Sequence, residues 1–271
     1  MEAEIQRFQQ DVWDYYARHG RTMPWRIIGK SGQIDPYHVL VSEIMLQQTQ
    51  VQRVIPKYEV FIKTFPTVHD LAQASLGDVI RMWQGLGYNR RAKFLWQTAH
   101  IISDTYAGDV PLNEEKLVAL PGIGKNTALA ICCYAANVPV AFVETNIRTV
   151  YIHYFFSDKE KVADADILQL VELTYDREDP RQWYWALMDY GTYLKSVFGN
   201  SARQSSKYSK QSAFNGSLRQ IRGQVLKHLS QEEYSLHALQ ELITDTRLHD
   251  VLVALQKEGF IIKRNNRFEL V

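Results

Sequence analysis

The sequence predicts an all-α protein with a small α+β module at its C-terminal end. Up to about residue 215, apolar residues recur at three- and four-residue spacing, which is the period of amphipathic helices. Glycine and proline residues separate these periodic segments. Alternation of apolar and polar residues, which is typical of strands, appears only near the C-terminal end.

Length and composition agree with a globular fold. The chain has 271 residues, 46% of them hydrophobic and 23% charged, which are ordinary values for globular domains. No apolar run reaches the roughly 18 residues that a transmembrane helix requires, and the acidic N-terminus does not resemble a signal peptide. The adjacent Cys132 and Cys133 suit neither a disulfide framework nor a metal site. We therefore expect a soluble, cytoplasmic protein.

The clearest helical patterns lie at residues 75–87, 90–108 and 113–138. Residues 201–216 are rich in serine, lysine and glutamine and are typical of a linker or extended loop. Beyond it, three short helices are predicted at 218–229, 235–243 and 246–259, and two strands flank a tight turn at Asn265 and Asn266. Three helices followed by a hairpin describe a winged-helix domain, a class that includes both DNA-binding and protein-binding members.

Charge is distributed unevenly along the chain. Residues 157–180 contain eight acidic and three basic residues, whereas residues 190–231 contain no acidic residue. The basic residues of the second stretch are Lys195, Arg203, Lys207, Lys210, Arg219, Arg222 and Lys227. Such a stretch suggests a polyanionic partner, and a solvated loop is an equally good interpretation when the stretch is taken alone.

The most informative motif is LPGIGKNTA, which runs from Leu120 to Ala128. Its glycines permit positive φ and close backbone approach, and the first amide groups of the next helix form a seat for an anion. A turn of this kind between two helices is a helix-hairpin-helix, which holds a DNA phosphate without reading sequence. The candidate phosphate contacts are Gly122, Gly124, Lys125 and Thr127. A helical turn without a ligand is the alternative.

Seven segments of the chain occur in a characteristic order: PWR (24–26), DPY (35–37), SEIMLQQTQV (42–51), FPTVHDLAQA (65–74), WQGLGYNRRA (83–92), LPGIGKNTA (120–128) and LMDYG (187–191). Their order resembles that of the helix-hairpin-helix (HhH-GPD) DNA glycosylase superfamily. The chain most closely resembles the MutY adenine glycosylases over roughly residues 5 to 195, because SEIMLQQTQV and GLGY are specific to that branch. LPGIG is shared by the whole superfamily.

The resemblance implies a two-lobed helical domain at residues 1–216. A six-helix lobe would span about 27–136, and a second lobe would combine 1–26 with 137–216, including a basic loop at 195–216. A winged-helix-like domain would follow at 217–271.

The resemblance also implies a reaction. Adenine leaves deoxyribose only when the base is protonated and the positive charge on the sugar is stabilised, which calls for one neutral and one ionised carboxyl group. Glu43, which is expected near the start of an otherwise apolar helix, matches the acid that protonates the purine, and its apolar surroundings would raise its pKa. Glu144 matches the carboxylate at the sugar, and Asn146 matches an asparagine that orients the site.

The base must leave the duplex before it reaches these groups. By resemblance, the residues that enter the gap are Gln48, Leu86 and Tyr88, although core packing is the alternative for Leu86 and the aromatic residues. Arg26, Tyr37 and Asn126 would line the base pocket. Contacts with the DNA backbone would come from Lys195, Arg203, Lys207 and Lys210.

The chain departs from the family pattern in four places. Position 144 holds glutamate where the family has aspartate; the extra methylene moves the carboxylate by about 1.5 Å, and misplacement by about 1 Å can cost on the order of 10²-fold in rate. Asn126 replaces the Schiff-base lysine of bifunctional members, and Lys125 points roughly 100° away around the helix, so no AP-lyase activity is expected. Lys195 falls at the first cluster cysteine and no cysteine follows, so no iron–sulfur cluster is expected. About 55 residues replace the NUDIX-like domain of the family.

These observations lead to three functional hypotheses. The first is a monofunctional glycosylase of base excision repair that removes adenine opposite 8-oxoguanine or guanine, acting as a monomer on double-stranded DNA of the nucleoid. The second is a glycosylase for another base, such as thymine or uracil opposite guanine. The third is a DNA-binding protein that has lost catalysis. No cofactor is expected, although the resemblance allows a monovalent or divalent cation to bridge the hairpin and a DNA phosphate.

Overall fold

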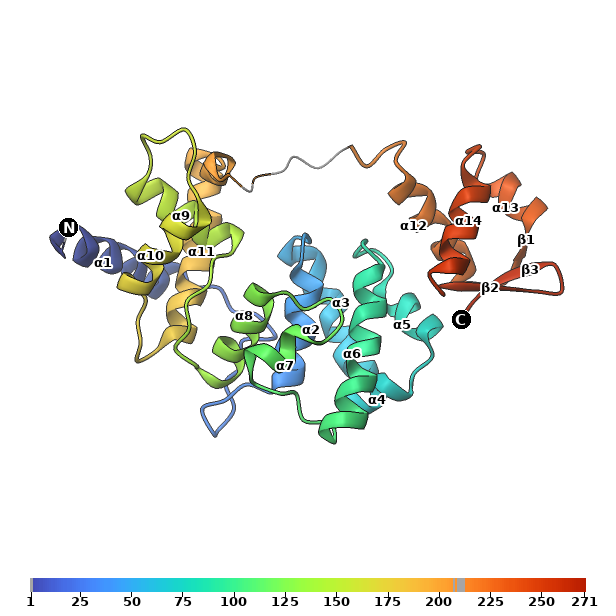
Figure 1. Cartoon of the computed structure of the whole chain (residues 1–271), viewed down its shortest axis with the longest axis horizontal. Helices are drawn as coiled ribbons and strands as arrows, with labels where there is room; N and C mark the ends of the chain where they lie inside the picture. The colour runs from blue at the N-terminus through green and yellow to red at the C-terminus, as the bar shows by residue number, and fades with distance from the viewer. Residues whose placement is uncertain (1, 207, 209–212) are drawn as a thin grey trace. The chain divides into compact units, whose positions relative to one another are not determined.

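The computed structural model of the chain describes residues 2–206, 208 and 213–271 (Figure 1). It contains two compact units that interleave along the sequence. Unit 1 combines residues 2–39 and 112–118 with the described part of 123–210, and unit 2 combines 40–111 and 119–122 with the described part of 211–271. None of the described helices is both long and apolar enough to cross a membrane.

Unit 1 is helical. Its elements are α1 (Glu2–His19), α7 (Glu114–Val118), α8 (Lys125–Ala136), α9 (Thr145–Phe155), α10 (Asp164–Thr174), α11 (Pro180–Phe198) and the 3₁₀ turn η1 (Ser201–Gln204). Helices α9 and α11 pack against each other, and α1 packs on α11. Aromatic rings fill the core between them, with the Phe8 centroid 5.1 Å from Tyr151 and 5.8 Å from Trp183.

The contact between α9 and α11 depends on a glycine. A Cβ atom on Gly191 would lie 2.4 Å from the carbonyl oxygen of Asn146, which is far inside van der Waals contact. No larger residue fits here unless the two helices move apart. Helix α11 begins with Pro180 in its first turn and with Asp179 as N-cap, whose side chain accepts from the amide of Gln182.

The helices of unit 2 surround a second core. They are α2 (Pro36–Leu46), whose first turn is counted with unit 1, α3 (Val51–Thr64), α4 (Val68–Gln73), α5 (Leu76–Trp83) and α6 (Arg90–Tyr106). Helices α4 and α5 both pack on α6. The core of this part of unit 2 contains the fully buried Phe61, Leu71 and Trp83. Thr67 forms a capping box with Asp70 at the start of α4, and Ser75 caps α5.

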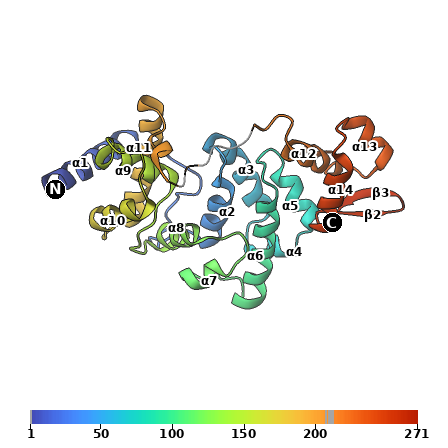
Figure 2. The ribbon, with the colours of Figure 1, turned by 45° about the horizontal axis from the view of Figure 1, so that its top comes forward.

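The C-terminal module of unit 2 runs α12 (Leu218–Leu229), β1 (Tyr234–Ser235), α13 (Leu236–Leu242), α14 (Leu248–Lys257), β2 (Ile261–Arg264) and β3 (Arg267–Leu270). The strands form an antiparallel sheet in the order β1-β3-β2 (Figure 1), and Figure 2 shows β2 and β3 side by side. Asn265 and Asn266 turn the hairpin at φ 47° and 60°, as a two-residue turn with positive φ requires. The predicted helices and hairpin are present; β1 was not predicted, because two residues are too few to show alternation.

The helical fold with a small C-terminal α+β region is confirmed, and two local predictions need correction. The basic loop expected from residue 195 begins as helix, because α11 continues to Phe198. Glu43 was expected near the start of a helix, but α2 begins at Pro36 and places Glu43 in its second half. This earlier start follows from Asp35, whose carboxylate accepts from the Tyr37 amide at 2.8 Å. Lys207 and Lys210 lie outside the described residues.

We predict that Gly191→Ala destabilises the protein by about 3 kcal/mol, because the added methyl group collides with backbone rather than with a flexible side chain. Urea unfolding of the purified variant measures the loss. Gly223→Ala, within α12, is the matched control: nothing lies within 4 Å of its Cβ position, so we expect a gain of about 0.5–1 kcal/mol from helix propensity. Equal stability of the Gly191→Ala variant and the unmodified protein would contradict the assigned helix contact.

Candidate active site

The predicted sugar-facing carboxyl group, that of Glu144, lies at the N-terminal end of α9 in unit 1. Glu144 is the N-cap residue, with extended backbone (φ −105°, ψ 173°), and its side chain makes no capping hydrogen bond. The preceding residues Phe142 and Val143 are buried. The side-chain amide of Asn126, on the first turn of α8, donates to the Val143 carbonyl oxygen at 2.7 Å. Asn126 therefore holds the backbone immediately before Glu144.

The surroundings of Glu144 disfavour its charged form. Burial raises the pKa of the carboxyl group from 4.5 to about 7, and the nearby Arg148 guanidinium opposes this shift. Arg148 is itself bound in two hydrogen bonds of 2.8 and 2.9 Å to Asp164. Because its charge is shared with that second carboxylate, Arg148 offsets only part of the effect of burial. Near neutral pH, Glu144 is therefore partly protonated in the free protein.

Asn146, two residues further on, is held by α11. Its amide nitrogen donates to the Met188 carbonyl and the Thr192 hydroxyl, both at 3.3 Å, and its oxygen accepts from Lys195 Nζ at 2.7 Å. All three partners favour the same amide orientation. Lys195, which was predicted to contact DNA backbone, is directed at Asn146, and burial together with Arg148 lowers the pKa of its amine.

Arg26 and Tyr37 were predicted to line the base pocket. The guanidinium of Arg26 binds Asp189 in two hydrogen bonds of 3.0 Å and lies 5.2 Å from the Trp185 ring. Asp189 is 2% exposed and also pairs with Arg21 at 2.7 Å. A carboxylate buried this deeply requires such partners. In the free protein, therefore, Arg26 neutralises the charge of Asp189. Tyr37 is buried.

The helix-hairpin-helix motif forms the turn between α7 and α8. Gly122 has φ 77°, and a Cβ there would lie 2.8 Å from Phe94 Cβ, so the position requires glycine. Gly124 is the N-cap of α8 and supplies no side-chain cap, and the N-terminal end of a helix attracts anions. Lys125 is exposed on this turn and pairs with Glu114 at 3.5 Å.

Unit 2 carries the predicted acid and the residues predicted to enter DNA. Glu43 is partly accessible, between the buried Ser42 and Ile44. Gln48 is exposed and Tyr88 half-buried, and both have positive φ, 55° and 48°. Leu86, by contrast, is 2% exposed. Of the three predicted intercalating residues, the free structure therefore presents Gln48 and Tyr88 at the surface and packs Leu86 in the core.

Positive φ at Gln48 and Tyr88 is a strained conformation for residues other than glycine, costing about 1–3 kcal/mol each. The other such residues described lie at helix C-terminal caps or in the hairpin turn, at Ala107, Asn137, Asn265 and Asn266. Gln48 follows the end of α2, whereas Tyr88 lies two residues before α6. Surrounding contacts must therefore hold the two loops in place.

Arg91 supplies these contacts. It is 8% exposed, and its guanidinium lies 5.4 Å from the Trp83 ring and 5.5 Å from the Tyr88 ring. It donates hydrogen bonds to six oxygen atoms on the two loops and on the end of α2, those of Ile44, Met45, Gln47, Thr49, Leu86 and Gly87. Burial lowers the pKa of Arg91 to about 10, so it stays charged at neutral pH. One cation thus joins the Gln48 loop to the Tyr88 loop.

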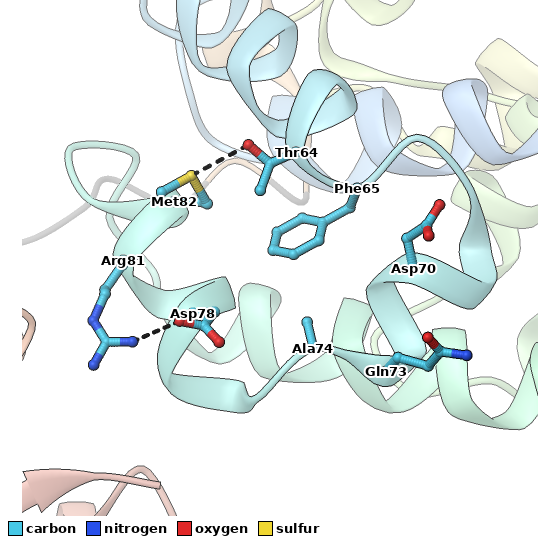
Figure 3. A pocket seen from close by; sticks show the side chains of 8 residues that line it. All are labelled: Thr64, Phe65, Asp70, Gln73, Ala74, Asp78, Arg81 and Met82. Atoms are coloured by element: carbon cyan, nitrogen blue, oxygen red, sulfur yellow. Dashed lines mark hydrogen bonds and ion pairs between the residues drawn. The ribbon is translucent and has the colours of Figure 1, made fainter.

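A separate hollow of about 430 Å³ lies in unit 2 among α3, α4 and α5 (Figure 3). Its lining residues are Thr64, Phe65, Asp70, Gln73, Ala74, Asp78, Arg81 and Met82. It contains none of the predicted site residues, and its polar groups are engaged locally, with Arg81 paired to Asp78 at 2.7 Å. Among the residues that the structure describes, no cluster of three histidine, cysteine or acidic side chains suits a metal ion.

Sequence reasoning missed three positioning roles. Arg91 lies in the matched segment WQGLGYNRRA, but the sequence predicted no role for it. Lys195 and Asn126 were assigned to DNA contacts and to the pocket, whereas in the free protein they bind Asn146 and the Val143 carbonyl. No local pattern predicts the contacts of Asn126 and Lys195, because their partners lie 17 and 49 residues away along the chain.

We predict that Glu144→Gln stabilises the protein at pH 8.5 more than at pH 5.5. The raised pKa means that ionisation favours the unfolded chain, so stability falls as the pH rises from about 4.5 to about 7. Glutamine removes this loss, which grows by at most about 1.4 kcal/mol for each pH unit between these two values. Urea unfolding at both pH values measures it, with the exposed Glu160→Gln as control. Equal gains at both pH values would contradict the raised pKa.

The chain is similar to known DNA repair proteins. Residues 41–172 match the HhH-GPD superfamily base excision DNA repair proteins. The adenine DNA glycosylase of Buchnera aphidicola subsp. Baizongia pistaciae is 40% identical over 189 residues, 69% of this chain and 52% of that protein, so the chain spans about half the length of this relative. The adenine DNA glycosylase of Mycobacterium tuberculosis (strain H37Rv) is 32% identical over 91% of this chain and 92% of its own length.

Two solved structures are similar in fold. A thermostable thymine-DNA glycosylase superposes with a TM-score of 0.63 at 26% identity, covering 70% of this chain and 87% of that one. Endonuclease III in a non-covalent DNA complex superposes with a TM-score of 0.61 at 17% identity, covering 73% and 88%. The chain therefore belongs to the HhH-GPD superfamily of base excision DNA repair proteins and, within it, to the adenine DNA glycosylase family.

Proposed function

We propose that the protein is a monofunctional DNA glycosylase that hydrolyses the N-glycosidic bond of a mispaired adenine, opposite 8-oxoguanine or guanine. The observation that carries this proposal is the fixed position of Glu144 at the start of α9, with Asn126 bound to the preceding carbonyl and Lys195 bound to Asn146. Rigid support of this kind is what a group needs to stabilise charge on a reacting sugar.

The reaction has two coupled requirements. The adenine leaves the base stack, while Gln48 and Tyr88, which lie on strained loops, occupy the gap. Glu43 donates a proton to the purine as the glycosidic bond breaks, and the ionised Glu144 stabilises the positive sugar until a water molecule adds to C1′ and releases a proton to solvent. The products are free adenine and an abasic site. Asn126 offers no amine for a Schiff base, so strand cleavage by β-elimination is not part of the reaction.

Binding to DNA would be largely independent of sequence. The amide groups at the start of α8 hold one phosphate at the Gly122–Thr127 turn, and a cation at the hairpin is compatible with this contact. Arg203, exposed on η1, adds a positive charge. The winged-helix interpretation of residues 217–271 gives the protein a second DNA-facing element. We propose that a monomer suffices, without an iron–sulfur cluster, on nucleoid DNA in the cytoplasm.

A second candidate activity is removal of thymine or uracil opposite guanine. Similarity to the thermostable thymine-DNA glycosylase favours it, as does the Glu144 substitution in the predicted site. A panel of duplexes that carry A, T or U opposite guanine or 8-oxoguanine separates the two activities in single-turnover assays with alkaline cleavage. Excision of adenine supports the first proposal, and excision of thymine or uracil alone supports the second. Binding without any excision would indicate a DNA-binding protein that has lost catalytic activity.

We predict that Glu43→Gln lowers the single-turnover rate on adenine opposite 8-oxoguanine by about 10²–10⁴-fold, because the amide cannot donate the required proton. Binding to the same duplex, measured by fluorescence anisotropy, should change little. Glu59→Gln, on the exposed side of α3, is the matched control and should retain the unmodified rate. Full activity of Glu43→Gln would exclude Glu43 as the acid.

We predict that Glu144→Asp also lowers the rate, by on the order of 10²-fold. The Asn126 hydrogen bond fixes the backbone before residue 144, so the shorter side chain withdraws the carboxylate from its working position. The assay is the same single-turnover measurement. An increase in rate would instead show that glutamate compromises the site.

A further inference from the structure

The C-terminal module contacts Tyr88 directly. Arg219, on the first turn of α12, donates from Nη1 to the Tyr88 hydroxyl at 2.9 Å, and its guanidinium carbon lies 5.8 Å from the Tyr88 ring centroid. The Arg91 guanidinium lies 5.5 Å from the same ring. Two cations, one from the helical part of unit 2 and one from the module, thus hold the side chain of Tyr88.

The module is also fixed to the start of α6, a few residues beyond Tyr88. Glu258 forms two hydrogen bonds with Arg90, at 3.0 and 2.9 Å, and two with Arg222, both at 2.9 Å. These two guanidinium groups hold the pKa of Glu258 at about 2, so the ion pairs persist at neutral pH. The amine of Lys93, one turn further along α6, donates to the Glu258 carbonyl oxygen.

Further contacts attach the module to α5, on the other side of the Tyr88 loop. The amide of Gly77 donates to the Val271 carbonyl at 2.6 Å, and Arg81 Nε donates to the Ser230 carbonyl at 3.1 Å. The module therefore contacts the helices before and after the loop that carries Tyr88. Arg219, which belongs to the module, contacts Tyr88 itself.

The backbone of Tyr88 has a strained conformation, and the contact with Arg219 stabilises it. At φ 48° the residue occupies a region that is costly for a tyrosine, so the loop has alternative conformations of similar or lower intrinsic energy. A hydrogen bond from a charged donor to the phenol, with a cation on the ring, favours the observed conformation over these alternatives. If binding requires one loop conformation, the apparent affinity is proportional to the fraction of molecules that have this conformation.

We propose that Arg219 is a positioning residue for base extrusion: the C-terminal module holds the Tyr88 side chain in the conformation that enters the DNA stack. The proposal rests on the proposed function, because it assigns Tyr88 to the DNA gap. It gives the module a role in catalysis that requires no base-specific contact of its own.

The test is a double-mutant cycle with Arg219→Met and Tyr88→Phe. Methionine keeps an apolar stem and removes the charged donor, and phenylalanine keeps the ring and removes the hydroxyl. Two readouts are measured: fluorescence of 2-aminopurine at the adenine position of a duplex with 8-oxoguanine opposite, which reports unstacking, and the single-turnover excision rate of adenine. Lys227→Met is the matched control, since it removes one positive charge from the exposed side of the same helix.

We expect Arg219→Met to lower the unstacking signal and the excision rate by about tenfold, the effect expected from loss of one charge-assisted hydrogen bond. In the Tyr88→Phe background the same change should have less than about a third of this effect, because the hydroxyl partner is already absent. Lys227→Met should weaken binding only slightly, in a salt-dependent way, and should leave unstacking at saturating protein unchanged.

Two results would overturn the proposal: equal effects of Arg219→Met with and without the Tyr88 hydroxyl, or effects no larger than those of Lys227→Met. Thermal unfolding of each variant identifies a loss caused by an unfolded module, and Arg219→Lys, which keeps a donor, should recover part of the signal. If the unmodified protein unstacks 2-aminopurine but excises no adenine, the proposed function fails while an Arg219-dependent unstacking signal still supports this inference.

Discussion

Buried guanidinium groups hold the irregular segments that carry the predicted site residues. Backbone carbonyls in such segments lack the partners that helices and sheets provide, and leaving them unpaired away from water is costly. Arg91 supplies donors to the two loops of unit 2. In unit 1, Arg181 binds the carbonyl of Gly32, in a loop, and that of Ala135, in the last turn of α8, at 2.8 and 3.0 Å, while Arg26 binds Asp189. The fivefold donor set of arginine suits this task, and lysine would not replace it.

Lys195 shows how a substitution at a family position is accommodated. The resemblance places a cluster cysteine there, and the following cysteines are missing from the chain. In the structure the amine of Lys195 binds Asn146 on α9. Gly191, one turn earlier on α11, has no side chain and so permits the backbone of Asn146 to approach closely. A side-chain hydrogen bond therefore joins the end of α11 to the start of α9 within unit 1.

The sequence predicted the helices well because each has a regular apolar period and clear punctuation; 218–229, for instance, was predicted with the bounds that α12 has. The motif LPGIGKNTA likewise predicted a glycine turn with an uncapped helix start. What it did not predict are contacts between distant residues. Burial of Leu86, the bonds of Arg91 and the Arg219–Tyr88 pair depend on tertiary packing, which no spacing within a segment records. The two-residue strand β1 exists only because β3 pairs with it.

A pKa near 7 for Glu144 is at first sight at odds with the role proposed for it, that of a carboxylate which is ionised when the sugar becomes positive. The conflict disappears when the free protein is compared with the transition state. In the free protein the charge has little compensation, so ionisation is costly; when the glycosidic bond breaks, a positive charge forms on the sugar, and attraction at low dielectric is strong. The interaction is then realised mainly in the transition state, which is the condition for accelerating a reaction rather than for tightening binding. The burial that makes Glu144 a cost to the fold is thus the feature that would make it effective in catalysis.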